Sequence, residues 1–336
     1  MKTKLLFAAL LCATNAYASC GSTFCAVDTH WDTQGLANDE GLRIDLRYSY
    51  AKANKLRYGN SYATLAASDG SGRGELENMR TINRVLDFDV DYVVSDKWNL
   101  AVDLPFIMRD HTHTLDYNNG VSNGSVVQQA KFNQLGDMQV VGKYKFDSDD
   151  HHAGSGIRLG LKLPTGSIDQ TMTPQDPTKP PGTPYVLDRS SQPGSGSTDI
   201  ILGAYYHHDS ANTPWGWFAS GQLQSAVSTR NDYRPGNGMN LDAGVHYAFS
   251  AALTGLLQLN TQVKQRDGGL LANPTHSGGH SLNLSPGLSY AVVPRTRLYS
   301  FVQLPIVQYV NGDASDPDLR QLTAPWSFSI GISHSY

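Results

Sequence analysis

The side chains best suited to chemistry in this sequence are histidines that stand beside aspartates. They occur as Asp149-Asp150-His151-His152, as His207-His208-Asp209 and, in a predicted outer loop, as Asp110-His111-Thr112-His113. Imidazole and carboxylate groups together bind zinc or copper. The spacing matches no defined metal site, so polar residues in solvated turns are the simpler interpretation. We predict no metal centre and keep as weak candidates only His151, His152, His207 and His208.

A hydrolase is the second chemical possibility, because His246 and Asp242 fall on one face of an alternating run. A serine hydrolase also needs a nucleophile that is held on a sharp turn within reach of the histidine. No serine lies in a recognisable nucleophile elbow, and serine is too common here to be diagnostic. We therefore predict that the protein is not an enzyme and uses no cofactor.

The N-terminus has the parts of a secretory signal. Met-Lys-Thr-Lys is positive, residues 5–13 are apolar and Ala16-Tyr17-Ala18 offers a cleavage site, so residues 1–18 are predicted to be a cleaved signal peptide. Tyr17 disfavours lipidation of Cys20, because an acylation signal has a small aliphatic residue there. Cys20 and Cys25 would remain in an oxidising compartment, and their spacing fits neither zinc nor redox motifs. We predict a disulfide between them, within a periplasmic N-terminal segment of residues 19–40.

Composition narrows the class of exported protein. Charged residues make up 17% of the chain, aromatic residues make up 10%, and the mean hydropathy is −0.36. After the signal, no apolar run approaches the ~20 residues of a transmembrane helix. The net charge of −4 offers no basic field to nucleic acid. These properties favour a membrane β-barrel, in which only the lipid-facing half of each strand must be apolar.

Alternating runs provide the strands of such a barrel. Leu42 to Tyr50 and Leu86 to Val94 place apolar residues on one face and mostly charged residues on the other. With similar runs there are about twelve strands, an even number, and their connections alternate between short and long. The predicted fold is all-β, a transmembrane antiparallel up-and-down β-barrel over residues 41–336, with both termini periplasmic. The other expected strands cover residues 97–108, 135–146, 156–164, 198–208, 215–228, 240–250, 252–264, 281–292, 297–310 and 326–336.

The inward faces of these strands carry charges of both signs, which argues against strong ion selectivity. A barrel of this size has room for a narrow lumen, although the charges could instead pair and solvate a plugged interior. The predicted lumen-lining residues are Arg43, Asp45, Arg47, Asp87, Asp89, Asp91, Asp103, Lys143, Lys145, Arg158 and Lys162.

Two further patterns concern the strand ends. Aromatic residues gather near the short turns, as in the girdle at a membrane interface. The last run repeats an apolar row that resembles the signal for outer-membrane barrel assembly, made of Trp326, Phe328, Ile330, Ile332 and Tyr336. A Leu-Pro pair also follows three alternating runs, at Pro105, Pro164 and Pro305. Since proline cannot donate to a ladder, each is predicted to mark a strand end or a bulge.

Three short motifs resemble a known family. They are Leu135-Gly136-Asp137, Leu161-Lys162-Leu163-Pro164-Thr165-Gly166 and Gln192-Pro193-Gly194-Ser195-Gly196-Ser197-Thr198-Asp199. They resemble the family of outer-membrane proteins labelled as transporters of the meta-pathway of phenol degradation. The resemblance is firm over residues 135–210, looser over the rest of the barrel, and absent from residues 20–31 and from the histidine pairs. It implies passage of aromatic or other hydrophobic compounds.

We therefore expect a protein of the Gram-negative outer membrane that acts as a channel for passive diffusion of small hydrophobic or aromatic compounds. Its expected partners are the lipid bilayer and lipopolysaccharide, the outer-membrane assembly machinery and small-molecule cargo, with no nucleic acid. The first alternative is a non-conducting binding or structural barrel, with metal capture as one version. A membrane hydrolase is the last alternative.

Overall fold

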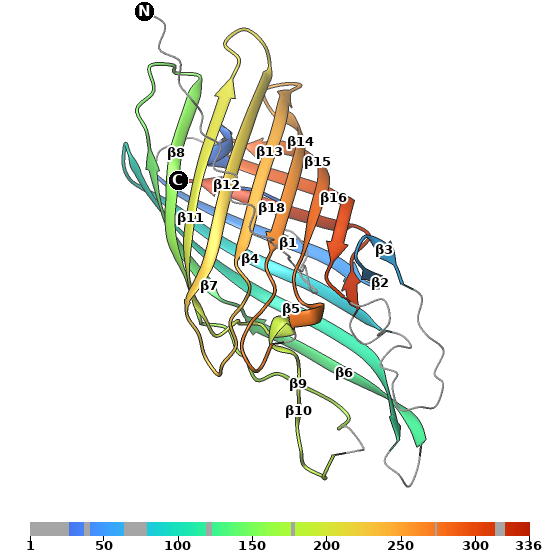
Figure 1. The fold of residues 1–336 in the computed structure, drawn as a ribbon. Coiled ribbons are helices and arrows are strands. Elements are labelled where there is room, and N and C mark those ends of the chain that lie inside the picture. Colours follow the sequence, from blue (N-terminus) through green and yellow to red (C-terminus); the bar gives the residue numbers. More distant parts are fainter. Residues whose placement is uncertain are drawn as a thin grey trace, which may run out of the picture.

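The computed structural model describes residues 27–36, 41–63, 79–118, 123–175, 179–272, 274–312 and 320–336 (Figure 1). Its main sheet has 13 strands in antiparallel order, and pairing of β4 with both β1 and β5 closes the sheet on itself. β6 and β7 both pair with the same side of β5, one after the other along its length, so they count as one strand position. The closed barrel therefore has 12 strand positions around its circumference. The predicted fold class is confirmed. None of the helices among the described residues is long and apolar enough to cross a membrane.

The barrel strands follow one another around the wall in chain order. Their bounds are β1 (Leu42–Ala53), β4 (Arg80–Ser95), β5 (Trp98–Asn118), β6 (Asn123–Leu135), β7 (Met138–Lys145), β8 (Ala153–Leu163), β11 (Thr198–Asp209), β12 (Trp215–Ser228), β13 (Gly238–Ala248), β14 (Leu253–Lys264), β15 (Gly279–Val293), β16 (Thr296–Val310) and β18 (Ser327–Ser335). Short turns lie at one end together with the C-terminus, and longer connections lie at the other, here called the loop end (Figure 1).

Small elements decorate the loop end. A separate three-stranded sheet of β2 (Lys55–Tyr58), β3 (Ser61–Tyr62) and β17 (Gln321–Thr323) lies beside the end of β16 (Figure 1). The connection from β8 to β11 holds β9 (Thr171–Met172), β10 (Tyr185–Val186) and the short helix η2 (Arg189–Ser191). Another short helix, η3 (Pro274–His276), lies between β14 and β15.

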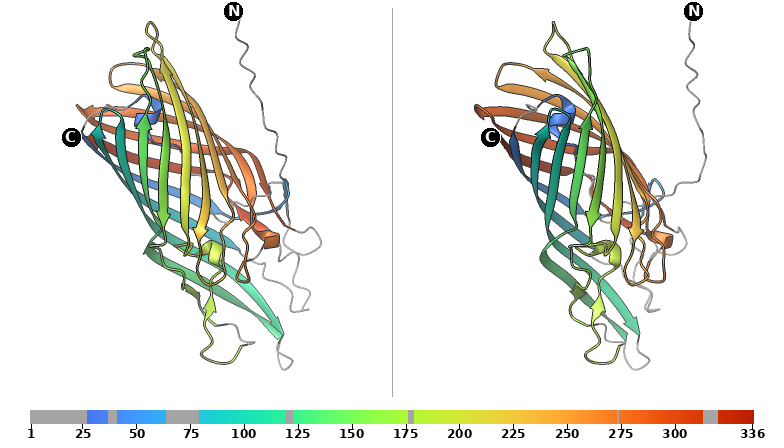
Figure 2. Two further views of the ribbon diagram at one scale, coloured as in Figure 1. Left: turned by 60° about the vertical axis from the view of Figure 1, so that its left-hand side comes forward. Right: turned by 90° about the vertical axis from the view of Figure 1, so that its left-hand side faces the viewer.

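One predicted loop is a hairpin instead. Residues 109–134 were expected to form a long outer connection, but β5 continues to Asn118 and β6 pairs with it from Leu135 back to Asn123. The hairpin extends beyond the rest of the barrel (Figure 2). Its two faces are both rich in polar residues, so it lacks the apolar row by which the other strands were recognised.

The two faces of the wall differ as the alternating runs predict. Outward-facing apolar side chains such as Leu159, Leu202 and Leu257 are exposed, whereas polar side chains face inward. Exposed aromatic pairs lie near the short turns, for example Tyr206 with Trp217, whose ring centroids are 5.0 Å apart. An apolar outer belt with aromatic rings at its edge suits a bilayer and its interface.

The three Leu-Pro sites interrupt regular pairing, as predicted. Pro164 directly follows the end of β8. Pro305 lies at a register shift between β15 and β16. Pro105 pairs with Asp87 on β4, but on its other side it marks the break between β7 and β6.

Candidate functional site in the barrel lumen

A short N-terminal segment, Val27–Leu36, lies inside the barrel at the short-turn end (Figure 2). We call it the plug. Its centre is the short helix η1 (Trp31–Gln34), which ends at Gly35 in the left-handed conformation (φ 74°). The sequence assigned residues 19–40 to the periplasm, but the described part of that segment is in the lumen because its side chains pair with the inward faces of the strands. Cys20 and Cys25 lie outside the described residues.

The plug is anchored on one side by apolar packing. Trp31 is 2% exposed and lies edge-on to Tyr299, with ring centroids 4.8 Å apart. Phe301 and Leu256 complete this cluster together with Val27. Burying a large aromatic side chain stabilises by about 1.5–3 kcal/mol relative to leaving it exposed. Trp31 is thus the main apolar anchor of the plug.

Ion pairs hold the opposite side of η1. Asp32 accepts from Lys143 Nζ at 2.8 Å and from Arg43 at 3.0 Å, and both cations also contact Asp91 at 2.5 Å. All four side chains are nearly inaccessible to solvent. Burial opposes ionisation of Asp32, but the charges of Lys143 and Arg43 outweigh it and hold the pKa of this carboxyl well below its usual range. Asp32 therefore binds as a carboxylate.

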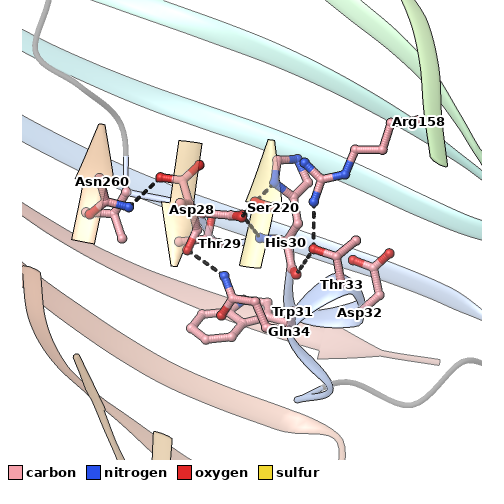
Figure 3. A network of polar contacts seen from close by, with 12 residues as sticks. Asp28, Thr29, His30, Trp31, Asp32, Thr33, Gln34, Arg158, Ser220 and Asn260 are labelled. Carbon is pink, nitrogen blue, oxygen red and sulfur yellow. Dashed lines mark hydrogen bonds and ion pairs between the residues drawn. The ribbon is translucent and has the colours of Figure 1, made fainter. Parts of the chain in front are cut away.

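Several other polar groups of the plug are hydrogen-bonded to strands from around the barrel (Figure 3). Ser220 Oγ donates to Asp28 Oδ2 at 2.9 Å, and Gln258 Nε2 donates to the carbonyl oxygen of Asp28 at 3.0 Å. Arg47 donates to the carbonyl of Val27 and to Thr29, and Arg158 donates to Thr33 at 2.6 Å. Because these donors come from β1, β8, β12 and β14, the plug ties opposite walls together.

A polar cavity of about 180 Å³ remains beside the plug. It is bounded by His30 and by Asp45, Asp89, Asp103, Gln139 and Asp242 from five strands. Asp45 and Asp89 are register partners, and so are Asp89 and Asp103, so three carboxylates stand side by side on β1, β4 and β5.

The structure places the predicted lumen residues on the inner wall, and it pairs many of them. The cavity is lined by Arg43, Asp45, Arg47, Asp89, Asp91, Asp103, Lys143 and Arg158. Asp87 accepts from Arg47 at 2.9 Å. Lys145 lines a smaller recess near Asp32, and Lys162 lies further toward the loop end.

Lys162 belongs to a second buried network, formed by the family-like motifs. Asp137 accepts from the backbone N–H groups of Gly166 and Ser195 at 3.0 and 2.8 Å, and from Lys162 Nζ at 3.1 Å. Lys162 also contacts Asp199 at 3.1 Å and is hydrogen-bonded to Ser195. The backbones of Gly166 and Gly194 touch, and a Cβ on Gly194 would lie 2.3 Å from the Gly166 carbonyl oxygen. We call this network the loop clasp, because it folds the long β8–β11 connection onto the barrel.

Lys162 Nζ lies 3.1 Å from a carboxylate oxygen of both Asp137 and Asp199. His246 contacts Asp209 Oδ1 at 2.8 Å rather than Asp242, its predicted neighbour. Within the described part of the chain, no serine hydrogen-bonds to His246.

The histidine runs are dispersed. His151 and His152 are exposed in their turn, His207 lies against Gly154, and His208 is 3.5 Å from Asp150. Across the described ranges, no three His, Cys, Asp or Glu side chains are grouped to hold a metal ion. His111 and His113 lie on β5 rather than in a loop, buried and 3.2 Å apart.

The wall itself has a gap, here called the wall opening. Pairing of β16 with β18 ends at Gln303 and Ser327, although β16 continues to Val310. Among the described strands, none continues the β18 ladder beside residues 304–310, the part of β16 at the loop end. A cavity here is lined by inward-facing Asn83 and Gln303, and by His280, Tyr309 and Trp326. One hydrogen bond crosses it, from Gln308 Nε2 to the Ala324 carbonyl oxygen at 3.0 Å.

The sequence did not reveal the plug, and it indicated the wall opening only as a break in strand pairing at Pro305. The plug lacks strand periodicity, and its partners are scattered over the whole barrel. Trp31 between Asp28 and Asp32 was the available signal, because a tryptophan among carboxylates is unusual in a solvated tail. The Leu-Pro pair at Pro305 was a direct signal of the opening.

The overall structure is similar to that of a known outer-membrane channel. The crystal structure of the COG4313 outer membrane channel from Pseudomonas putida F1 matches with a TM-score of 0.63 and 10% identity, covering 93% of this chain and 100% of that one. The P. putida toluene transporter TodX matches less closely, with a TM-score of 0.47, 10% identity and coverage of 89% and 91%. No family model and no curated protein sequence matches this chain. The protein thus has the fold of an outer-membrane β-barrel channel.

Proposed function

We propose that the protein is an outer-membrane channel through which small hydrophobic or aromatic compounds pass by passive diffusion. The observation that carries this proposal is the combination of a lumen filled by the plug with an opening in the wall. The apolar outer belt and the channel-like fold support the location. An axial pore for ions would instead need an unobstructed lumen.

The wall opening suits apolar cargo. It connects the inner wall near Asn83 with the outer face at Tyr309 and Trp326. Its volume is about 40 Å³, whereas a cavity that binds benzene has roughly 150 Å³. Passage therefore requires residues 322–326 to move away from β16, which breaks the Gln308–Ala324 hydrogen bond across the opening.

A pair of cysteines tests this route. In a background with Cys20→Ser and Cys25→Ser, Gln308→Cys with Ala324→Cys closes the opening when oxidised. The matched control is Val302→Cys with Phe328→Cys, two neighbours in the intact ladder. Uptake of radiolabelled toluene by cells should stop on oxidation of the first pair, return on reduction, and be unaffected in the control. Unchanged uptake with the first pair fully oxidised would refute the wall route.

A binding or structural barrel is the second candidate, because the plug fills the lumen. It predicts no toluene uptake above that of cells without the protein. In either case we propose that the protein belongs to the meta-pathway family of phenol-degradation transporters, is exported by residues 1–18, and carries the Cys20–Cys25 disulfide. The proposal also includes both termini in the periplasm, no enzymatic activity, lipopolysaccharide and lipid as surroundings, and assembly through the terminal strand.

A further inference from the structure

A further cavity lies at the short-turn end, between the plug and the turn that joins β15 to β16. Its volume is about 380 Å³. Trp31 and Leu36 of the plug form one wall, and the turn contributes residues 291–297, with Ser333 and Ser335 from β18. This cavity is separate from the wall opening, which lies at the loop end.

Three arginines and no described carboxylate line this cavity. They are Arg43, Arg295 and Arg297. Arg43 is already paired with Asp32 and Asp91. The other two make no ion pair with a described carboxylate, and the side chain of Arg297 has one long hydrogen bond, 3.4 Å to Ser289 Oγ.

Arg297 is less well paired than other inward-facing cations. Arg47, Lys143 and Lys162 each lie within 3.1 Å of an aspartate oxygen, and Arg109 and Arg158 donate to uncharged oxygens at 2.7 and 2.6 Å. Arg297 is half-buried and faces the same interior, opposite Ser333 on β18. A guanidinium that is partly removed from water and has no counterion carries a desolvation penalty, which a bound anion would offset.

The rest of the lining specifies what kind of anion fits. The plug presents the apolar side chain of Leu36 beside the edge of the almost fully buried Trp31, and the turn adds Val293 and Pro294. Ser333 and Ser335 offer hydroxyl groups beside the arginines. An apolar body with one carboxylate matches this arrangement, since guanidinium groups bind carboxylates through two parallel N–H donors.

We infer that this cavity binds small aromatic carboxylates, with the carboxylate on Arg297 and Arg295 and the ring against the plug. The inference deepens the proposed function by naming an ionised class of cargo, and it rests on that function only for its physiological meaning. Binding itself is independent of transport.

Calorimetric titration of the detergent-solubilised full-length protein tests the inference. Benzoate should bind, whereas benzyl alcohol and acetate, which lack the charge and the ring respectively, should bind at least about tenfold more weakly. Arg297→Gln should weaken benzoate binding about 10- to 100-fold, and Arg297→Lys, which keeps the positive charge, should weaken it less. Arg266→Gln is the matched control, because Arg266 hydrogen-bonds to Pro274 and Thr275 at the opposite end.

Each outcome of the titration either supports or overturns the inference. Heat modifiability on gels establishes that the variants are folded. Absence of benzoate binding, equal binding of benzyl alcohol, or an unchanged affinity in Arg297→Gln would each overturn the inference. Benzoate binding without any toluene uptake would leave the cavity assigned and refute the channel.

Discussion

The two ends of the barrel hold a chain segment in place by the same chemistry, but only one was visible in the sequence. At the loop end, Asp137 of the loop clasp gathers donors from Lys162, Gly166 and Ser195, all within recognisable motifs. At the short-turn end, Asp32 of the plug gathers Arg43 and Lys143 from distant strands. A buried carboxylate with several donors is thus a general fastening here. Sequence reveals it when the partners are neighbours in a motif and hides it when they are not.

The two fastenings can be separated most clearly by removing the plug. Deletion of residues 27–36 should change the protein from silent to conducting in planar bilayers, because the plug then no longer fills the lumen at the short-turn end. The matched control, Asp137→Asn, alters the loop clasp and should stay silent. Conductance that is equal with and without residues 27–36 would mean that the plug does not block the axis.

The loop clasp should be the greater contributor to stability. Asp137→Ala leaves Lys162 and two backbone N–H groups without this partner, and removal of one member of a buried ion pair costs about 3–5 kcal/mol. We expect a lower thermal unfolding midpoint and faster proteolysis within residues 164–197. Asp147→Ala breaks only the exposed pair with Lys97, so the unfolding midpoint and the proteolysis rate should both stay close to those of the wild type. Equal effects of the two variants would contradict the clasp.

A single substitution should loosen the plug without removing it. Asp32→Asn keeps the shape of the side chain but loses the charge that Lys143 and Arg43 bind, which is worth about 1.5–3 kcal/mol. The open fraction in bilayer recordings should rise by about 10- to 100-fold. A variant as silent as the wild type would assign the anchoring to Trp31 alone.

Acid should weaken the ion pairs of Asp32 with Lys143 and Arg43 only at low pH. The pKa of Asp32 is lower in the folded protein than in the unfolded chain, so its contribution is fully present above the unfolded value of about 3.9. That contribution is lost only as the pH falls through the folded value. Bilayer recordings at pH 4.5 should therefore be as silent as those at pH 7. Opening between these two values would assign control of the plug to another group.

The smallest effect on stability is expected outside the lumen, at the C-terminus. Tyr336→Asp places a charge at the edge of the aromatic belt, which costs only about 0–1 kcal/mol. If the terminal row is an assembly signal, however, the amount of folded barrel in the outer membrane should fall steeply. Tyr62→Asp, at an exposed site on the loop end, provides the comparison. Similar amounts of folded protein from both variants would count against the signal.

Alternation with period two made most of the wall predictable. It located the strands, the outward apolar rows and the inward charges, because each strand separates a lipid-like environment from a polar one. The same rule failed for the β5–β6 hairpin, where Asp110 and Lys131 face outward and His111 and His113 face inward. Beyond the apolar belt both faces meet polar surroundings, and the pattern disappears although the ladder continues.

The candidate site was predictable only as a set of inward charges. Arg43 and Lys143 were recognised as lumen residues, but their partner Asp32 was placed in the periplasm. Ten residues without periodicity carry no sign of where they dock, since their contacts depend on the closed barrel. Pro305 indicated the wall opening, but the position of the opening also depends on where β18 begins, at Ser327.

Because β18 begins only at Ser327, it pairs with β16 as far as Gln303 and no further. The two parts of β16 are therefore supported differently. Up to Gln303 this strand has ladders on both sides, but from Leu304 to Val310 its ladder is with β15, and among the described strands only the bridge from Val310 to Gly59 supports the other side. Amide hydrogens in the first part should exchange with deuterium only when the barrel opens as a whole, whereas those in the second part exchange through small local fluctuations. A single strand therefore carries a gradient from stiff to compliant. The seam can flex at the loop end while closure of the barrel at the other end remains intact.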